Sequence, residues 1–88
     1  MTWNVLWSPS AEQDLAEILR DEDFRSQSIR ALVAIDADLA CDAVNTGESR
    51  SSGRRIHMVS PIGIIFQVNV RLQEALVTHV WRYRVTGT

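Results

Sequence analysis

The chain has 88 residues, of which 45% are hydrophobic and 23% are charged, and it carries a net charge of −2 with a pI of about 5.5. This length suits one domain, and the composition is that of an ordinary globular protein and excludes a disordered or fibrous one. No apolar run approaches the roughly 18 residues of a membrane helix, and the N-terminus lacks the features of a signal peptide. We therefore expect a single domain over residues 1–88 and a cytoplasmic location.

Cysteine usage bears on redox environment and on metal binding. Cys41 is the single cysteine, so no internal disulfide can form, which suits a reducing compartment. Its neighbours include no His or Cys at the spacing of a zinc site. We expect neither a metal nor a cofactor.

The charges are divided unequally along the chain. Residues 1–48 contain ten acidic residues and three arginines, whereas residues 49–88 contain six arginines and a single acid, Glu74. The basic residues are all arginines. This division predicts either a basic surface for phosphate or carboxylate partners, or two halves that neutralise each other within the fold.

The first predicted element is a strand that leads into a helix. Residues 3–7 alternate in the manner of a strand, and we expect their two tryptophans, Trp3 and Trp7, to pack the core or an interface. Ser8 and Pro9 then predict a helix start, because serine caps a helix and proline suits its first position. We expect this helix to end near residue 20, where the acidic run at residues 21–23 interrupts its apolar stripe.

A longer helix is predicted over residues 25–44. Its apolar residues at helical spacing predict a single core-facing stripe. Asp36 lies within that stripe, and we expect it to be partly exposed or paired with an arginine of the sheet, a functional carboxylate being the alternative. The expected stripe consists of Ile29, Leu32, Val33, Leu39, Ala40 and Ala43.

Three strands are predicted after a polar loop at residues 48–53. They cover residues 54–59, 62–70 and 75–83, and their short connections predict antiparallel neighbours. The order β-α-α-β-β-β predicts an α+β fold, with an antiparallel sheet and two N-terminal helices packed on one face.

This order of elements, with an arginine-rich C-terminal sheet, resembles that of the RelE/ParE toxin superfamily. The resemblance covers the whole chain through four short motifs, and the Arg-Arg-Ile strand is most similar to the YoeB-like branch. The motifs are "WSPSAEQDLAEIL" at residues 7–19, "GRRI" at 53–56, "PIGIIFQV" at 61–68 and "LVTHVWRYR" at 76–84.

The resemblance implies the toxin component of a bacterial type II toxin–antitoxin system, which inhibits growth when free of its antitoxin. RelE-like members cleave mRNA in the ribosome, and ParE-like members inhibit DNA gyrase without enzymatic activity. A degenerate toxin that only binds an antitoxin is a third reading. All three imply a cognate antitoxin and a hetero-oligomer with it, and the target is either the ribosome with its mRNA or gyrase.

Metal-free RNA cleavage would require groups that move protons and stabilise charge on the phosphate. Arginine suits the second task because its guanidinium presents a planar fork of donors. Arg54 and Arg55 face opposite sides of a strand, so only one can serve a given site. We choose Arg55, which aligns better with the family's arginine. The resulting catalytic candidates are Arg55, Arg82, Tyr83 and Arg84.

Further residues are candidates for binding RNA or a partner protein. His79 lies in an apolar strand, and we expect it to be a hydrogen-bonded core residue, with a role in catalysis or binding as the alternative. Trp81 could stack on a nucleobase, cover the edge of the core or contact the antitoxin. Gly63 departs from the RNA-cleaving pattern, in which an arginine precedes the apolar triplet of the central strand. The binding candidates are Arg50, Arg54, His79 and Trp81.

Overall fold

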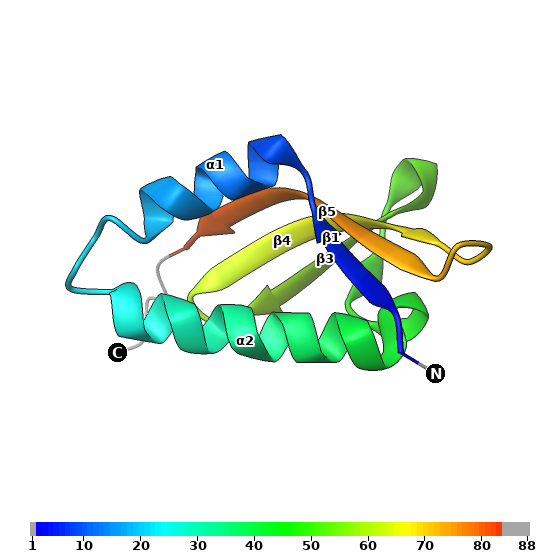
Figure 1. The fold of residues 1–88 in the computed structure, drawn as a ribbon, viewed down its shortest axis with the longest axis horizontal. Coiled ribbons are helices and arrows are strands. Elements are labelled where there is room, and N and C mark those ends of the chain that lie inside the picture. The colour runs from blue at the N-terminus through cyan, green and yellow to red at the C-terminus, as the bar shows by residue number, and fades with distance from the viewer. Residues whose placement is uncertain (1, 84–88) are drawn as a thin grey trace.

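The computed structural model describes residues 2–83, which form a five-stranded sheet with two helices on one side (Figure 1). In chain order the elements are β1 (Asn4–Trp7), α1 (Pro9–Ile18), α2 (Arg25–Asp42), β2 (Glu48–Ser49), β3 (Arg54–Val59), β4 (Ile62–Asn69) and β5 (Glu74–Arg82). Turns of 3₁₀ helix, Ala43–Asn45 and Ser51–Gly53, lie before and after β2. The predicted α+β class is confirmed, and the short strand β2 is an addition to it. Neither helix in the described part of the chain is both long and apolar enough to cross a membrane.

The strands lie in the order β1-β5-β4-β3-β2. β3, β4 and β5 form the predicted antiparallel meander. β1, however, runs parallel to β5, so the sheet is mixed rather than wholly antiparallel. The reason is topological: α1 and α2 carry the chain from one edge of the sheet to the other, and the meander returns to β1 in β1's own direction.

α1 begins at the residues that predicted it. The Ser8 Oγ accepts a hydrogen bond from the Ala11 N–H at 3.1 Å, and Pro9 occupies the first helical position. Further along, the Asp14 carboxylate accepts a hydrogen bond from the Val80 N–H at 3.4 Å. Because β1 pairs with β5 only as far as Val77, α1 satisfies part of the β5 edge that β1 leaves free.

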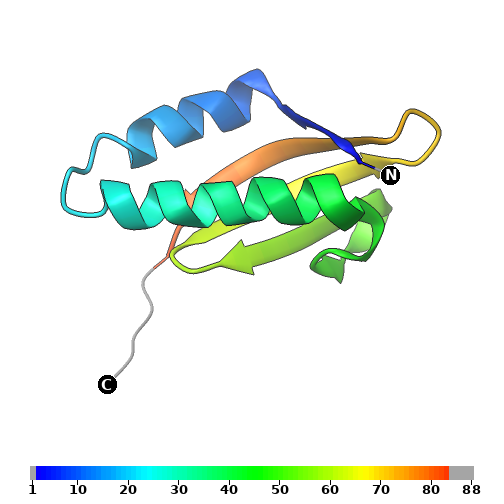
Figure 2. The same ribbon diagram turned by 60° about the horizontal axis from the view of Figure 1, so that its bottom comes forward.

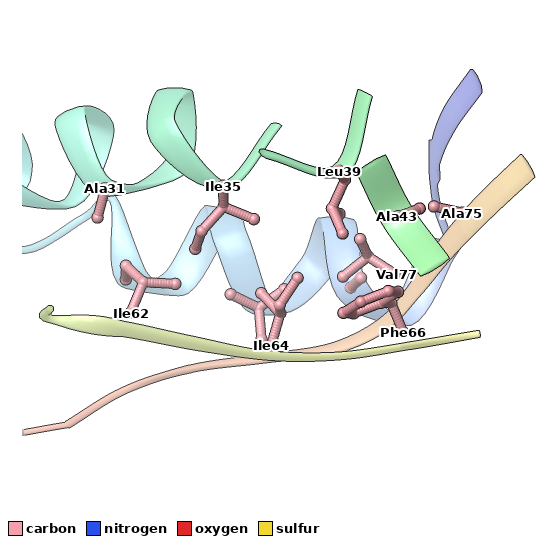
Figure 3. Close-up of a cluster of buried hydrophobic side chains, with 11 residues drawn as sticks. Ala31, Ile35, Leu39, Ala43, Ile62, Ile64, Phe66, Ala75 and Val77 are labelled. Atoms are coloured by element: carbon pink, nitrogen blue, oxygen red, sulfur yellow. The ribbon is translucent and has the colours of Figure 1, made fainter. Parts of the chain in front are cut away.

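The core lies between α2 and the sheet. Figure 3 shows one row of α2 side chains packing on those of β4. The row follows an i, i+4 spacing through Ala31, Ile35, Leu39 and Ala43, all of them buried. The predicted stripe was wrong at its N-terminal end, where Ile29 and Val33 are exposed. The buried residues in this part of the helix are Ser28 and Ala31, so these small side chains face the sheet in place of Ile29 and Val33. Trp3 and Trp7 pack against the core, as predicted.

A β-bulge in β5 decides which side chains face the helices. Ile65 pairs with His79, but the next residue, Phe66, pairs with Val77, so Thr78 is an extra residue in β5. Val77 and Val80 therefore both face the helices and are buried, whereas His79 and Trp81 lie on the opposite side. We call this side, which the helices do not cover, the open face; Figure 2 shows both helices together on the other side.

Candidate functional site

Strand pairing determines which residues share the open face. On β3, Arg55 pairs with the buried Phe66 and His57 pairs with the buried Ile64, so the alternate residues of β3 point to the open face. The same rule applies to β4 and β5. The residues of these three strands that point to the open face are Arg54, Ile56, Met58, Gly63, Ile65, Gln67, Asn69, Glu74, Leu76, His79 and Trp81.

Arg54 and His79 lie on the open face on either side of β4. Arg54 pairs with Gln67 and His79 pairs with Ile65, so the two residues flank β4 and are offset by two residues along it. His79 is exposed, and its Nδ1 lies 3.0 Å from the Thr78 Oγ1. This corrects the expectation of a core histidine: the bulge at Thr78 reverses the alternation that would have buried it.

A small hollow lies at the β3 end of the open face. It has a volume of about 270 Å³ and combines apolar side chains from β3 and β4 with two arginines. Arg50 is already paired with the exposed Glu48 carboxylate at 3.2 Å, and both side chains are more than half exposed. The guanidinium of Arg54 has no ion-pair partner within residues 2–83. The hollow is lined by Arg50, Ser51, Arg54, Ile56 and Ile65.

Trp81 lies across Gly63 on the open face. A Cβ atom at Gly63 would stand 2.5 Å from both the Cε2 and the Cζ2 of Trp81 and 2.9 Å from its Nε1. The position at which RNA-cleaving toxins are expected to carry an arginine is therefore filled by the Trp81 indole. Trp81 can occupy this place only because residue 63 has no side chain.

Arg55 lies on the helix-covered side and holds the loop before β2. Its Nε donates to the Thr46 carbonyl at 2.8 Å, and its Nη2 donates to the Gly47 carbonyl at 3.0 Å. Gly47 adopts a positive φ of 70°, and a Cβ atom there would overlap the Ile56 carbonyl, so the position has no room for a side chain. Arg55 thus fixes a tight approach of the loop to β3.

Arg82 also lies on the helix-covered side, at the end of β5 where it pairs with Ile62. Its Nη1 lies 3.2 Å from the Asp21 carboxylate, and its guanidinium carbon lies 4.4 Å from the centre of the Phe24 ring. Arg82 therefore joins β5 to the connection between α1 and α2. Arg82 and Arg55 pair with residues four positions apart on β4, so the structure does not bring these two arginines together.

Of the remaining catalytic candidates, Tyr83 is half-buried and follows β5, with its N–H donating to the Pro61 carbonyl at 2.9 Å. Arg84 lies outside the described residues. The structure places Arg54, His79 and Trp81 on one face and Arg55 and Arg82 on the other. The catalytic roles themselves stay predictions.

A pair of side chains that the sequence did not predict joins β3 to α2. The His57 Nε2 lies 3.0 Å from the Asp38 carboxylate, with the histidine mostly buried and the aspartate about half exposed. Nineteen residues separate the two, and no local pattern links them. The Arg82–Asp21 pair likewise joins the basic C-terminal half to the acidic N-terminal half, so the two charge groups are partly neutralised within the fold.

Metal ligands do not gather in the described part of the chain, which contains no group of three or more His, Cys, Asp or Glu side chains able to hold an ion. Cys41 is exposed on α2. Asp36 is exposed on the same helix, which agrees with the first of the two structural settings expected for it. The chemistry available on the open face is therefore that of arginine, histidine and an indole ring beside aliphatic side chains.

Comparison with known proteins gives matches at the level of structure. No family model and no curated protein sequence matches the chain. The structure is similar to a chain of the RelBE2 toxin–antitoxin complex from Mycobacterium tuberculosis, with a TM-score of 0.73 and 15% identity over 96% of this chain and 100% of that one. It is also similar to a chain of the chromosomal ParDE toxin–antitoxin system from P. aeruginosa, with a TM-score of 0.70 and 18% identity over 94% of this chain and 98% of that one. The chain therefore has the fold of the RelE/ParE-type toxins.

Proposed function

We propose that this chain is the toxin of a type II toxin–antitoxin pair and inhibits growth when it is free of its antitoxin. The observation that carries the proposal is the extent of the structural similarity. Two structures from toxin–antitoxin systems match over 94% or more of the chain, so the likeness includes both helices and the sheet together. An antitoxin protein is the partner that this function requires.

Inhibition by binding, as ParE-like toxins inhibit DNA gyrase, is the mode of action that the geometry supports best. Arg55 and Arg82 bind other parts of the chain on the helix-covered side, and they pair with residues four positions apart on β4. Trp81 occupies the space above Gly63. A surface with an indole, aliphatic side chains and arginines suits protein binding, because aromatic residues and arginine are enriched where interfaces gain most of their energy.

Ribosome-dependent mRNA cleavage is the second candidate, and one observation favours it. His79 is exposed on the same face as Arg54, so a proton-transferring group and a phosphate-binding group share the open face. In this mode Arg54 takes the place that the sequence assigned to Arg55. Trp81 supplies a surface for base stacking.

The antitoxin is proposed to cover the open face. Its acidic side chains would face Arg50 and Arg54, and an apolar side chain would enter the hollow over Ile56 and Ile65. Covering this face would block either mode of action with one contact. A complex in which the open face stays uncovered would contradict this arrangement.

The test is induced expression in a bacterial host, with and without the adjacent gene as candidate antitoxin. We expect growth arrest with the chain alone and recovery with the pair. Primer extension on abundant transcripts and supercoiling of a reporter plasmid, measured in the arrested cells, then separate the modes. Lost supercoiling with intact transcripts supports gyrase inhibition, new cleavage sites within codons support mRNA cleavage, and normal growth contradicts the toxin proposal.

A further inference from the structure

α2 carries a second apolar stripe, outside the core. Ile29 is 45% exposed and Val33 is 65% exposed, although both are large aliphatic residues on a helix whose opposite side packs on the sheet. Beside them lies a shallow hollow of about 310 Å³ lined by Trp7, Ile29, Leu32, Val33 and Asp36. No described element of the fold covers this stripe.

The ends of the stripe carry opposite charges. Arg25 lies one turn before Ile29, and Asp36 lies one turn after Val33, so the four side chains follow one face of the helix. The Arg25 Nε donates to the Leu19 carbonyl at 2.7 Å, which holds the guanidinium at the start of α2. Neither Arg25 nor Asp36 has an ion-pair partner among residues 2–83.

We propose that this stripe binds a second copy of the chain, with the two α2 helices packed antiparallel about a two-fold axis. In that arrangement Arg25 of each copy faces Asp36 of the other, and the two copies bury Ile29 and Val33 against each other. A two-fold interface requires a surface that is complementary to itself. The order basic, apolar, apolar, acidic along one helix meets that requirement only when the second helix runs in the opposite direction.

The dimer is compatible with each role proposed for the open face, namely antitoxin binding, gyrase binding and mRNA cleavage. α2 lies on the opposite side of the sheet from Arg54 and Trp81, so pairing through α2 leaves both open faces accessible (Figure 2). The inference does not rest on the proposed function, because it uses only the exposure and charge order of α2. The small size of the apolar stripe indicates a weak and concentration-dependent association, at the lower end of specific interfaces.

The first test is sedimentation equilibrium of the purified full-length chain over a range of roughly 10 µM to 1 mM, in which a weak homodimer dissociates. Val33→Asp places a charge in the centre of the stripe and is expected to weaken the dimer at least about tenfold, because an unpaired charge must then be buried. Val70→Asp is the matched control: Val70 is 66% exposed in the turn after β4 and lies outside the stripe. Circular dichroism melts of both variants verify that each is folded.

The second test exchanges the charges at the ends of the stripe. Asp36→Arg alone should weaken the dimer by like-charge repulsion with Arg25, and the double variant Arg25→Asp with Asp36→Arg should restore it. A wild-type chain that stays monomeric over the whole range overturns the proposal. A dimer that Val33→Asp leaves unchanged overturns it as well, since another surface must then form the contact. A stripe that serves the antitoxin instead gives a monomeric chain whose antitoxin binding is lost in Val33→Asp.

Discussion

The packing of Trp81 on Gly63 gives the sharpest prediction for stability. Gly63→Ala adds one atom, and that atom would stand 2.5 Å from two carbons of the indole ring. Ordinary carbon contacts lie at about 3.5–4.0 Å, so the ring must move by about 1 Å or more. The indole must move as a whole, because the two contacted atoms belong to its rigid bicyclic system.

The expected magnitude follows from the overpacking. Inserting a methyl group into a filled space costs about 1–3 kcal/mol, and we take about 2 kcal/mol for this contact. In a domain of this size each kcal/mol lowers Tm by about 4–8 °C, which gives a decrease of roughly 8–16 °C for Gly63→Ala. Thermal and urea unfolding followed by circular dichroism measure both quantities.

A double-mutant cycle isolates the contact from any other effect of the alanine. In a Trp81→Ala background the obstacle is gone, so Gly63→Ala should change the free energy of unfolding by no more than about 0.5 kcal/mol. The account then requires a coupling energy of about 1.5–2 kcal/mol between the two sites. Equal losses from Gly63→Ala in both backgrounds would refute the reasoning, because the destabilisation would then have no connection with the indole.

Three further predictions concern the contacts that hold the elements together. Ser8→Ala removes the cap of α1 and should lower the free energy of unfolding by about 1 kcal/mol in urea titrations, whereas Ser10→Ala, exposed in the first turn, should change it little. Arg55→Gln removes the hydrogen bonds to the Thr46 and Gly47 carbonyls; we expect a loss of about 1–2 kcal/mol and faster amide exchange around β2, while Arg54→Gln leaves both unchanged. Arg82→Gln removes the ion pair with Asp21 and the stacking on Phe24, and should cost about 1 kcal/mol at low salt. A loss from Arg82→Gln that stays the same in about 1 M NaCl would contradict an electrostatic role for Arg82, since salt screens such half-exposed pairs.

The sequence predicted the elements well wherever a local signal marks them. Ser8 and Pro9 marked the start of α1, and residues 54–59 were predicted as the strand that forms β3. These features depend on a few neighbouring residues, whose capping and alternation act over short distances. The same holds for the opposite orientation of Arg54 and Arg55, which follows from strand geometry alone.

The features that were missed depend on contacts between distant segments. The bulge at Thr78 has no sequence signature, yet it moves His79 to the open face and Arg82 to the covered side. The stripe of α2 was misjudged at Ile29 and Val33 because apolar residues at helical spacing fit more than one face of this helix. The burial of Ser28, Ala31 and Ile35 shows which face packs on the sheet. The parallel pairing of β1 with β5 likewise depends on the whole path of the chain.

The grouping of the candidate site residues could not be predicted from the sequence. The arginines were predicted to serve phosphate or carboxylate partners, but the structure shows Arg55 and Arg82 binding other parts of the chain. Arg54, which the sequence placed among the binding residues, is the arginine of β3 that reaches the open face with His79 and Trp81. Only the register of three strands distinguishes these two groups.

The most direct test of the proposed functional role of the open face is the growth arrest caused by two arginine variants under identical induction. Arg54→Ala changes the open face, and Arg82→Gln changes the covered side; immunoblots of the soluble fraction equalise the amount of each protein. We predict that Arg54→Ala abolishes the arrest and that Arg82→Gln retains it. Arrest that persists in Arg54→Ala and disappears in a folded Arg82→Gln would contradict a functional open face. The toxic activity would then depend on the helix-covered side of the sheet.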